Sequence, residues 1–469
     1  MPAVVALFVI GSMANPAGAR PQDAGDWPAY LLTVGHSSFN QAATAITPAN
    51  AAGLQPAWTW VPDPPTQEGQ PPGYLYASPT VSNGTIYIGS ATGDFYAIDE
   101  DTGQVEWKVF VAFVPAQTCA GEGFTSTATV APDPITRQPT IYVGAADGYL
   151  YALDAADGSV DWRTQILDPG TSQGENAGYL WASPTVVAKH IYIGMSSQCD
   201  HPLIRGGLTS VDQATGAVLA TYYTVAPTSD GGSIWSTAAA STNGSKVWVT
   251  TGNADLDGHQ PGDSFSIVRL DGNSLAKTDK WTVPGLNKSD RDFGASPTLF
   301  TATLDGTPTQ MIGACNKNGN FYALRATNLR AGPVWTDHVG KAPIGECLAA
   351  AIWDGTRLFV PSNTTTIGTN HYQGAVRQVD PATGAYLWET GLPGQVVGSP
   401  TLDGSGVIAA GTFYARTNAV YLLDADDGTI LATVDTGGGP VFAQPVFAGP
   451  YLLVASVTQG LTAYEAPGS

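Results

Sequence analysis

The sequence predicts an all-β protein, an eight-bladed β-propeller built from four-stranded antiparallel blades. The first observation behind this prediction is an internal repeat that returns eight times along the 469 residues. The second is that each complete unit holds four strand-like runs separated by Gly, Asn and Asp turn signals. The third is the composition, since 55 Gly, 34 Pro and only 12% charged residues suit a turn-rich β protein and argue against helical bundles.

The clearest repeat unit covers residues 77–111 and reads ASPTVSNGTIYIGSATGDFYAIDEDTGQVEWKVFV. Short patterns mark its strands in order: SPTV, IYIG, YAID and a last run that ends in TGxxxW. Clear copies follow at 125–166 and 182–225, looser copies begin at Trp235, Gly294, Gly345 and Val397, and an incomplete one covers 442–466. A spacing of 45–60 residues between four-stranded units is typical of propeller blades.

The last unit holds only three strands, and the sequence offers a fourth near the other end of the chain. Residues 56–61, PAWTWV, resemble the missing outer strand. Pairing the two ends within one blade would close the ring and remove its open sheet edges. We therefore expect a single propeller domain over 56–467, preceded by a lead-in segment over 20–55.

Residues 1–19 are predicted to form a secretory signal peptide, because a short apolar run is followed by small residues and an Ala-x-Ala-like cleavage site. We therefore expect a secreted or periplasmic protein. The net charge of −20 repels phosphate backbones, so nucleic acid is not an expected partner. No other segment approaches the ~20 apolar residues of a membrane span.

Blade geometry predicts where a functional site would lie. The start of strand one and the end of strand two lie on the same face of a blade, nearest the central axis. The loops at these positions that depart most from the repeat are MSSQCD (195–200), TGNAD (251–255) and CNKNGN (315–320) after strand two, and GGSIW (231–235), RDFGASP (291–297) and GEC (345–347) before strand one. They gather Asp, Asn, Lys and Trp at one end of the ring, which we call the mouth.

The four cysteines also lie before a first strand or after a second strand, and they form no C-x-x-C motif. Cys119 and Cys199 come from neighbouring units, and so do Cys315 and Cys347. An exported protein favours disulfides, and the placement favours the pairs 119–199 and 315–347.

The stretch VWVTTGNADLDGHQPGDS (247–264) interrupts the repeat with a long acidic loop. Asn253 and Asp200 offer the hard oxygen ligands that calcium prefers. Asp255 and Asp257 are expected at the solvated edge of the mouth, and the loop lacks the closing Glu and flanking helices of an EF-hand. Read alone, this stretch is better explained as an ordinary solvated loop of an acidic protein.

The block ALDAADGSVDW (152–162) resembles the tryptophan-docking repeat of the quinoprotein propellers, in which the Trp packs against the next blade. The mouth segments resemble the site of pyrroloquinoline-quinone (PQQ) alcohol dehydrogenases, and the closest likeness is to members similar to polyvinyl-alcohol dehydrogenase. The resemblance implies that calcium is bound by Asp200 in SSQCD, Asn253 in VTTGN and Asp292 in RDFGASP, and that PQQ is bound by Asn253, by Lys317 in NKNGNFYAL and by Trp235 in GGSIW. It also implies catalytic roles for Asp292 and Lys317.

The activity implied by this resemblance is that of an exported, calcium- and PQQ-dependent alcohol dehydrogenase. Hydride would pass from the alcohol to PQQ while Asp292 accepts the alcohol proton and Lys317 stabilises negative charge. The substrate would be a small or polymeric alcohol, and a separate acceptor such as a cytochrome or quinone would take the electrons. Two departures from the family are Asp200 in place of the usual Glu and the missing disulfide of adjacent cysteines.

Two other functions remain open at this point. The first is that the protein is a quinoprotein-like propeller without cofactor that acts as a binding or assembly scaffold. Asp292, Lys317 and Trp235 would then have ordinary structural roles. A carbohydrate-binding or hydrolytic propeller is less favoured, because the sequence shows no Ser/His/Asp arrangement or paired acid motif.

Overall fold

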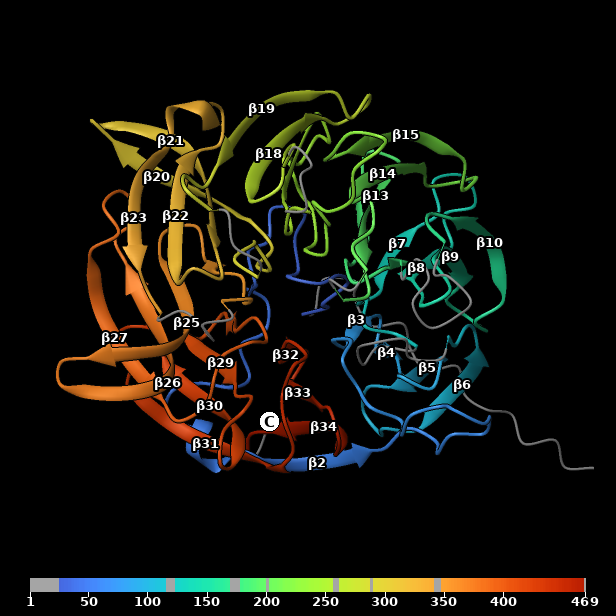
Figure 1. Ribbon diagram of the computed structural model, residues 1–469. Coiled ribbons are helices and arrows are strands. Elements are labelled where there is room, and N and C mark those ends of the chain that lie inside the picture. The colour runs from blue at the N-terminus through green and yellow to red at the C-terminus, as the bar shows by residue number, and fades with distance from the viewer. Residues whose placement is uncertain are drawn as a thin grey trace, which may run out of the picture.

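Eight four-stranded sheets stand around a central axis and confirm the predicted β-propeller (Figure 1). The computed structural model describes residues 25–114, 123–168, 178–199, 202–255, 261–286, 290–340 and 347–467. Its helical content within these ranges is limited to two 3₁₀ turns, η1 (Ala51–Gly53) and η2 (Leu329–Ala331). The predicted signal peptide lies outside the described residues.

Each blade runs outward from a first strand at the axis to a fourth strand at the rim. The first four blades are β3 (Thr80–Ser82), β4 (Thr85–Gly89), β5 (Asp94–Asp99), β6 (Val105–Phe110); β7 (Thr129–Pro132), β8 (Pro139–Gly144), β9 (Tyr149–Asp154), β10 (Val160–Gln165); β12 (Thr185–Val187), β13 (His190–Ser197), β14 (Gly207–Asp212), β15 (Val218–Tyr223); and β16 (Ala239–Ala240), β17 (Lys246–Thr250), β18 (Ser266–Asp271), β19 (Lys277–Thr282). Blade 3 also carries β11 (Gly178–Tyr179), which pairs with β13.

The second half of the ring repeats this order. Its blades are β20 (Thr298–Leu304), β21 (Thr307–Cys315), β22 (Asn320–Arg325), β23 (Pro333–His338); β24 (Ile352–Trp353), β25 (Leu358–Ile367), β26 (Asn370–Val379), β27 (Tyr386–Leu392); β28 (Thr401–Asp403), β29 (Val407–Gly411), β30 (Asn418–Asp424), β31 (Ile430–Gly438); and β32 (Val446–Ala448), β33 (Tyr451–Ser456), β34 (Gly460–Glu465) with β2 (Gln55–Trp60). Blade 7 also pairs with β1 (Phe39–Asn40), in parallel.

The ring is closed as predicted, because β2 from the N-terminal part is the outer strand of the C-terminal blade. It pairs antiparallel with β34, from Gln55 opposite Glu465 to Trp60 opposite Leu461. Closure leaves no blade of the ring without a neighbour and ties the two ends of the chain together. Figure 1 shows this strand running beneath the red C-terminal blade.

The docking tryptophans hold neighbouring blades together. Trp107 on the outer strand of blade 1 donates its Nε1–H to the Ala155 carbonyl of blade 2 at 3.1 Å. Its ring covers Gly158, where a Cβ would lie 2.7 Å from the indole, so the turn requires glycine. The same pairing joins Trp58 to Gly103, Trp162 to Gly216, Trp335 to Gly384 and Trp388 to Gly428. The structural role predicted for these tryptophans is therefore confirmed.

A belt of hydroxyl groups fixes the register of the blades around the axis. In each case a backbone N–H at the start of one blade donates to a side-chain oxygen at the equivalent position of a neighbour. These bonds run from Ser78 to Thr127, Thr127 to Ser183, Ser183 to Thr237, Thr237 to Ser296, Ala350 to Ser399 and Gln444 to Ser78, at 2.8–3.0 Å. The first strands of the blades thus begin at matched heights around the axis.

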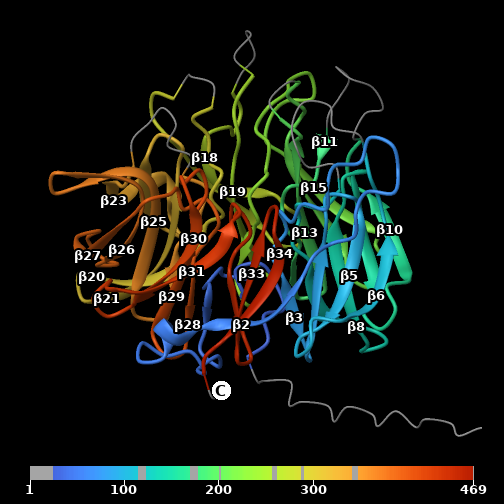
Figure 2. The ribbon, with the colours of Figure 1, turned by 90° about the horizontal axis from the view of Figure 1, so that it is seen from below.

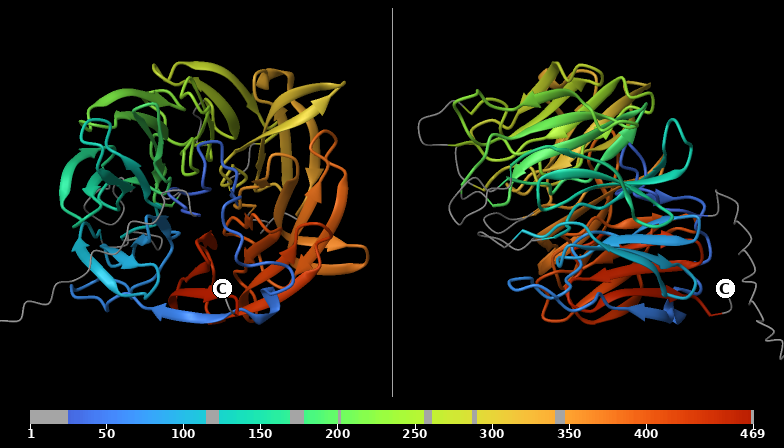
Figure 3. Two further views of the ribbon diagram at one scale, coloured as in Figure 1. Left: turned by 180° about the vertical axis from the view of Figure 1, so that it is seen from behind. Right: turned by 90° about the vertical axis from the view of Figure 1, so that its right-hand side faces the viewer.

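The lead-in segment has a role that the sequence analysis did not predict. Residues 27–40, which we call the strap, run inside the ring along the free edges of the innermost strands (Figure 3). Backbone bonds of 2.7–3.0 Å join the strap to six blades: Trp27 to Val81, Pro28 to Val130, Val34 to Ala240, Gly35 to Leu299, Ser37 to Trp353 and Ser38 to Leu402. These bonds satisfy strand edges that would otherwise be open.

His36 on the strap is buried in the centre of the ring, with 1% of its surface exposed. Its Nδ1 lies 2.7 Å from the Pro297 carbonyl oxygen, and burial lowers its pKa to about 4 although the Pro297 and Ala238 backbones oppose the shift. The unfolded chain, with an ordinary His pKa near 6.5, therefore binds more protons between these values. His36 should thus remove stability as the pH falls from about 6.5 towards 4, by up to about 3 kcal/mol.

Urea unfolding of the wild type and of His36→Gln at pH 7.5 and 4.5 tests this expectation. The comparison must be a difference between the two proteins, because burial raises the pKa of Asp403 to about 7 and gives a pH dependence of opposite sign. We expect the gap in unfolding free energy between wild type and variant to shrink by about 2 kcal/mol or more at the lower pH. A gap that is the same at both pH values would refute the buried neutral His36.

Candidate functional site

The predicted mouth is one face of the ring, opposite the face that carries the C-terminus. In Figure 2 the C-terminus lies at the lower edge and β11, which leads into blade 3, lies at the upper edge. Trp235 precedes β16, Asn253 follows β17, Asp292 precedes β20 and Lys317 follows β21. Antiparallel blades bring the starts of first strands and the ends of second strands to the same face, so these four residues share the mouth.

Trp235, Asp292 and Lys317 form one connected group. The Trp235 indole Nε1–H donates to Asp292 Oδ2 at 2.9 Å, and Lys317 Nζ lies 3.0 Å from Asp292 Oδ1. The same ammonium lies 4.9 Å from the centroid of the Trp235 ring. The Lys317 backbone N–H also donates to the Asp292 carbonyl at 3.0 Å, so the loops before β20 and after β21 are joined along both backbone and side chains.

The charges in this group are held in place by burial and pairing. The Asp292 side chain is 3% exposed and that of Lys317 14%, whereas Asp290, which also contacts Lys317 Nζ at 2.5 Å, is 63% exposed. Burial lowers the pKa of Lys317, but the charges of Asp292 and Asp290 outweigh it, so that the pKa lies above the ordinary lysine value. Lys317 is therefore a permanent cation beside a buried carboxylate.

Asn253 ties two of the predicted segments together. Its carbonyl oxygen accepts the Gly232 N–H at 2.6 Å, which holds the TGN turn against the GGSIW segment. Its side-chain Oδ1 accepts the Arg291 N–H at 3.3 Å, next to Asp292 in sequence. Asn253 is 3% exposed, so its amide lies inside the mouth and not on the acidic edge that follows it.

Other predicted features lie partly or wholly outside the described residues. Asp200 and Asp257 are not among them, and neither is Cys119 of the expected 119–199 disulfide, although Cys199 is disulfide-bonded. Within the described ranges, no three or more His, Cys, Asp or Glu side chains form a group that could hold a metal ion. Of the three predicted calcium ligands, the described residues thus include Asn253 and Asp292, and the bond to the Arg291 N–H brings Asn253 next to the segment of Asp292.

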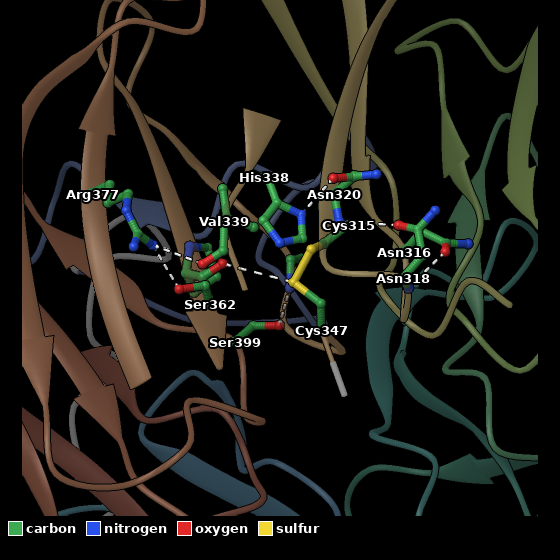
Figure 4. The surroundings of a disulfide bond; sticks show 12 residues. Cys315, Asn316, Asn318, Asn320, His338, Val339, Cys347, Ser362, Arg377 and Ser399 are labelled. Atoms are coloured by element: carbon green, nitrogen blue, oxygen red, sulfur yellow. Dashed lines mark hydrogen bonds between the residues drawn. A yellow bond between two sulfur atoms is a disulfide. The ribbon is translucent and has the colours of Figure 1, made fainter. Parts of the chain in front are cut away.

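The predicted disulfide between Cys315 and Cys347 is present, with Cα atoms 5.6 Å apart. It joins the end of β21 in blade 5 to the segment that leads into blade 6 (Figure 4). Both cysteines are buried, and Lys317 follows Cys315 by two residues. The disulfide therefore anchors the loop that carries Lys317.

Three polar residues at the mouth were missed by the sequence analysis. Asn316, Asn363 and Gln395 are at most 7% exposed. Within the described part of the chain, Asn316 Nδ2, both amide atoms of Asn363 and Gln395 Oε1 have no hydrogen-bond partner. Asp292 Oδ1 likewise receives no well-directed hydrogen bond there, despite the nearby lysine. Buried polar atoms normally have partners, so this group suits a polar ligand or water.

A signal for these residues does exist in the sequence. Asn316 follows strand two directly, where blade 2 has Ala145. Asn363 lies in PSNTTT, where the second strand of the sixth unit continues beyond the repeat pattern. Polar residues at positions that the repeat does not require could therefore have been added to the candidate site.

The absence of a side chain at Gly294 lets Trp235 reach this group. A Cβ there would lie 2.3 Å from the Trp235 ring and 2.4 Å from Leu348. We expect Gly294→Ala to displace the indole, break its bond to Asp292 and lower the unfolding free energy by about 1–3 kcal/mol. Gly340→Ala is the matched control, because its Cβ would meet no atom closer than 3.6 Å.

Urea unfolding and tryptophan fluorescence measure both effects. The account of the indole position is wrong if Gly294→Ala matches Gly340→Ala in stability and in its emission spectrum.

Comparisons with known proteins agree with this fold. The family model described as "Glucose/ethanol/alcohol dehydrogenase, beta-propeller domain" matches residues 27–336, and the model of the outer membrane protein assembly factor BamB matches 323–431. Quinohemoprotein alcohol dehydrogenase ADH IIB of Pseudomonas putida is 26% identical, over 66% of this chain and 47% of that protein. Polyvinylalcohol dehydrogenase of a Sphingopyxis species is 24% identical, over 68% of this chain and 53% of that protein.

The solved structures show the same architecture. The crystal structure of quinohemoprotein alcohol dehydrogenase from Comamonas testosteroni superposes with a TM-score of 0.73 at 18% identity, over 95% of this chain and 81% of that one. The chain spans about half the length of the curated relatives it matches. Since the first family model covers well over half of the sequence, the chain belongs to the PQQ-type β-propeller family of the glucose, ethanol and alcohol dehydrogenases.

Proposed function

We propose that this protein is a PQQ- and calcium-dependent alcohol dehydrogenase whose site is the mouth of the propeller. The observation that carries the proposal is the buried group in which Asp292 is bonded to Trp235 and paired with Lys317. A carboxylate, a cation and an indole face seldom meet in this way for packing alone, because burying a charge is costly unless a function or a pair retains it. The relatives that carry alcohol dehydrogenase names support the same activity.

The residues present fit both implied groups. Asn253 and Asp292 offer the amide and carboxylate oxygens that calcium prefers, and Asp200 would be a third ligand. Asn316 Nδ2 is buried without a hydrogen-bond partner in the described ranges, as expected of an atom that awaits a polar ligand, and Asp292 Oδ1 faces Lys317 Nζ at 3.0 Å. Lys317 and the Trp235 face would hold a planar, anionic quinone.

PQQ with its metal ion would supply the two-electron acceptor for alcohol oxidation. Asp292 would accept the proton of the substrate hydroxyl, for which it must be ionised. Lys317 Nζ pairs with this carboxyl group at 3.0 Å and would stabilise negative charge beside it. The Trp235 N–H orients Oδ2, and the Asp292 side chain, 3% exposed, has little contact with water.

The partners and location follow from this proposal. The substrate would be a small or polymeric alcohol, and a separate cytochrome or quinone would accept the electrons. The signal peptide proposed for residues 1–19 would export the protein to the periplasm or the medium. Among the described residues, no helix is long and apolar enough to cross a membrane.

The direct test is dye-linked oxidation of primary, secondary and polymeric alcohols by the purified protein with PQQ and Ca²⁺. We expect turnover that needs both additions. Asn253→Ala should raise the Ca²⁺ concentration for half-maximal activity at least about tenfold, since even residues behind a metal ligand have effects of that size. The assignment of Asn253 fails if the variant keeps the wild-type calcium requirement, and the proposal fails if no alcohol is oxidised.

A scaffold propeller without cofactor is the second candidate. It is favoured by the match of the assembly-factor model to residues 323–431. This match begins within blade 5 and ends within blade 7, and it leaves out Trp235, Asn253, Asp292 and Lys317. A scaffold would show neither PQQ binding nor alcohol oxidation, so the same assay separates the two functions.

A further inference from the structure

The hydroxyl belt allows residues at the mouth to be compared blade by blade. Two residues ahead of each belt position, every blade has one residue on the mouth face. In blade order these residues are Tyr76, Thr125, Trp181, Trp235, Gly294, Leu348, Val397 and Phe442. Trp235 of the candidate site is therefore one member of a ring of eight equivalent positions.

The repeat does not require an aromatic residue at this position. Blades 2, 5 and 7 fold with Thr125, Gly294 and Val397 there. The aromatic rings of blades 8 and 1 thus serve something other than blade formation. Blade 8 lies four places from blade 4 in a ring of eight, so the two blades face each other across the axis (Figure 1). Phe442 precedes β32 as Trp235 precedes β16, and the two positions are therefore on opposite sides of the mouth.

Further aromatic rings extend this side into a continuous wall over blades 7, 8 and 1. Tyr76 contacts Phe442 with ring centroids 6.0 Å apart, and Phe442 contacts Phe413 at 6.1 Å. Tyr74 lies 6.2 Å from Tyr76, and Tyr414 lies 4.4 Å from Phe413 at the other end. We call these five residues the aromatic arc.

The arc is open to solvent, unlike the core of the blades. Tyr414 is 66% exposed, and the other four rings are half-buried. Its members come from loops before strand one or after strand two, so the arc lies on the mouth face with the candidate site. Exposed aromatic surface beside a site is typical of ligand recognition.

We propose that the aromatic arc binds the hydrocarbon part of the substrate and makes the enzyme prefer alcohols with longer apolar chains. This inference rests on the proposed function, because it assumes that the hydroxyl end of the same molecule lies at Asp292. The five rings carry no charge, and a protein of net charge −20 repels anionic substrates, so an uncharged chain is the matching ligand. The arc faces the polar group across the mouth, as the two ends of an amphipathic alcohol require.

The test is a chain-length series from ethanol to 1-hexanol with the PQQ- and Ca²⁺-loaded protein. Burial of one methylene strengthens binding by up to about fourfold. We therefore expect kcat/KM to rise about two- to fourfold per added carbon in the wild type. Phe442→Ala should lower kcat/KM for 1-hexanol about tenfold and change that for ethanol less than about twofold. Tyr414→Ala, at an exposed position where folding is not at risk, should also reduce the rise of kcat/KM with chain length.

Phe110→Ala is the matched control, because Phe110 is an aromatic residue, 49% exposed, that lies on the outer strand of blade 1 at the rim of the ring and is not part of the aromatic arc. The inference is overturned if kcat/KM rises with chain length as steeply in Phe442→Ala and Tyr414→Ala as in the wild type. It is also overturned if Phe110→Ala reduces this rise as much as the two arc variants do. Saturation-transfer NMR with 1-hexanol and the protein without PQQ gives a readout that needs no turnover. If both arc variants lose this signal, the arc binds the hydrocarbon chain even if no alcohol is oxidised. If alcohol is oxidised without such a signal and without a chain-length effect, the proposed function stands and binding by the arc is refuted.

Discussion

Asp292→Asn should lower kcat/KM for alcohol oxidation by about 10³-fold, within the range of 10² to 10⁴ expected for loss of a general base. The amide keeps the shape of the side chain, and its oxygen can still accept the Trp235 N–H. It cannot take a proton from the substrate, and it leaves Lys317 without its buried counter-charge. Steady-state dye reduction with saturating PQQ and Ca²⁺ measures the loss.

Asp290→Asn is the matched control for this variant. It makes the same chemical change in a carboxylate that also contacts Lys317, but at a side chain that is 63% exposed. We expect its kcat/KM to stay within about threefold of the wild type, because an exposed ion pair contributes little. Equal losses in the two variants would mean that Asp292 acts only through the charge of Lys317 and would contradict its role as the base.

Trp27→Ala should lower the free energy of unfolding by about 3–5 kcal/mol. Trp27 begins the strap, is fully buried and packs in the apolar cluster that joins blade 1 to blade 8. Its backbone pairs with Val81 in both directions, at 2.9 and 3.0 Å. Loss of the ring therefore leaves a cavity at the seam where the first and last blades meet. Urea unfolding followed by circular dichroism gives the value.

Trp27→Phe provides the complementary control. Among the described residues the buried Trp27 Nε1 has no hydrogen-bond acceptor. Phe keeps most of the apolar volume and removes this unsatisfied donor, so the two effects oppose each other. We expect stability within about 1 kcal/mol of the wild type. A loss as large as that of Trp27→Ala would show that the indole N–H has a partner that this account omits.

The ring could be predicted because its parts repeat. Turn glycines such as Gly158 and docking tryptophans such as Trp107 recur at fixed spacing, and each has a local physical reason that a sequence displays. The closing strand β2 was identified for the same reason, since its Trp58 follows the docking pattern and covers Gly103. Local rules were thus sufficient for the blade number and for closure.

The strap could not be predicted, because its contacts are with strands distant in sequence and its backbone breaks local rules. Leu31, Leu32, His36 and Ser38 have φ values between 50° and 68°, which residues other than glycine seldom adopt. Only the surrounding blades stabilise such a backbone path, so no sequence pattern within residues 27–40 predicts it.

The candidate site was predictable as far as its loops depart from the repeat. The search for unusual loops before first strands and after second strands identified the segments of Trp235, Asp292 and Lys317. The structure brings these three side chains into contact. It missed Asn363, because this residue lies within the extended strand β25 and not in a loop. The roles of Asp200 and Asn253 as calcium ligands stay predictions.

Titration of the purified protein with PQQ, with and without Ca²⁺, tests the central claim most directly. We predict saturable quenching of tryptophan fluorescence at micromolar PQQ or below that strengthens with Ca²⁺, with weaker binding in Lys317→Ala and less quenching in Trp235→Phe. Binding that ignores both substitutions, or no binding at micromolar PQQ, would contradict the assignment of the mouth as the cofactor site.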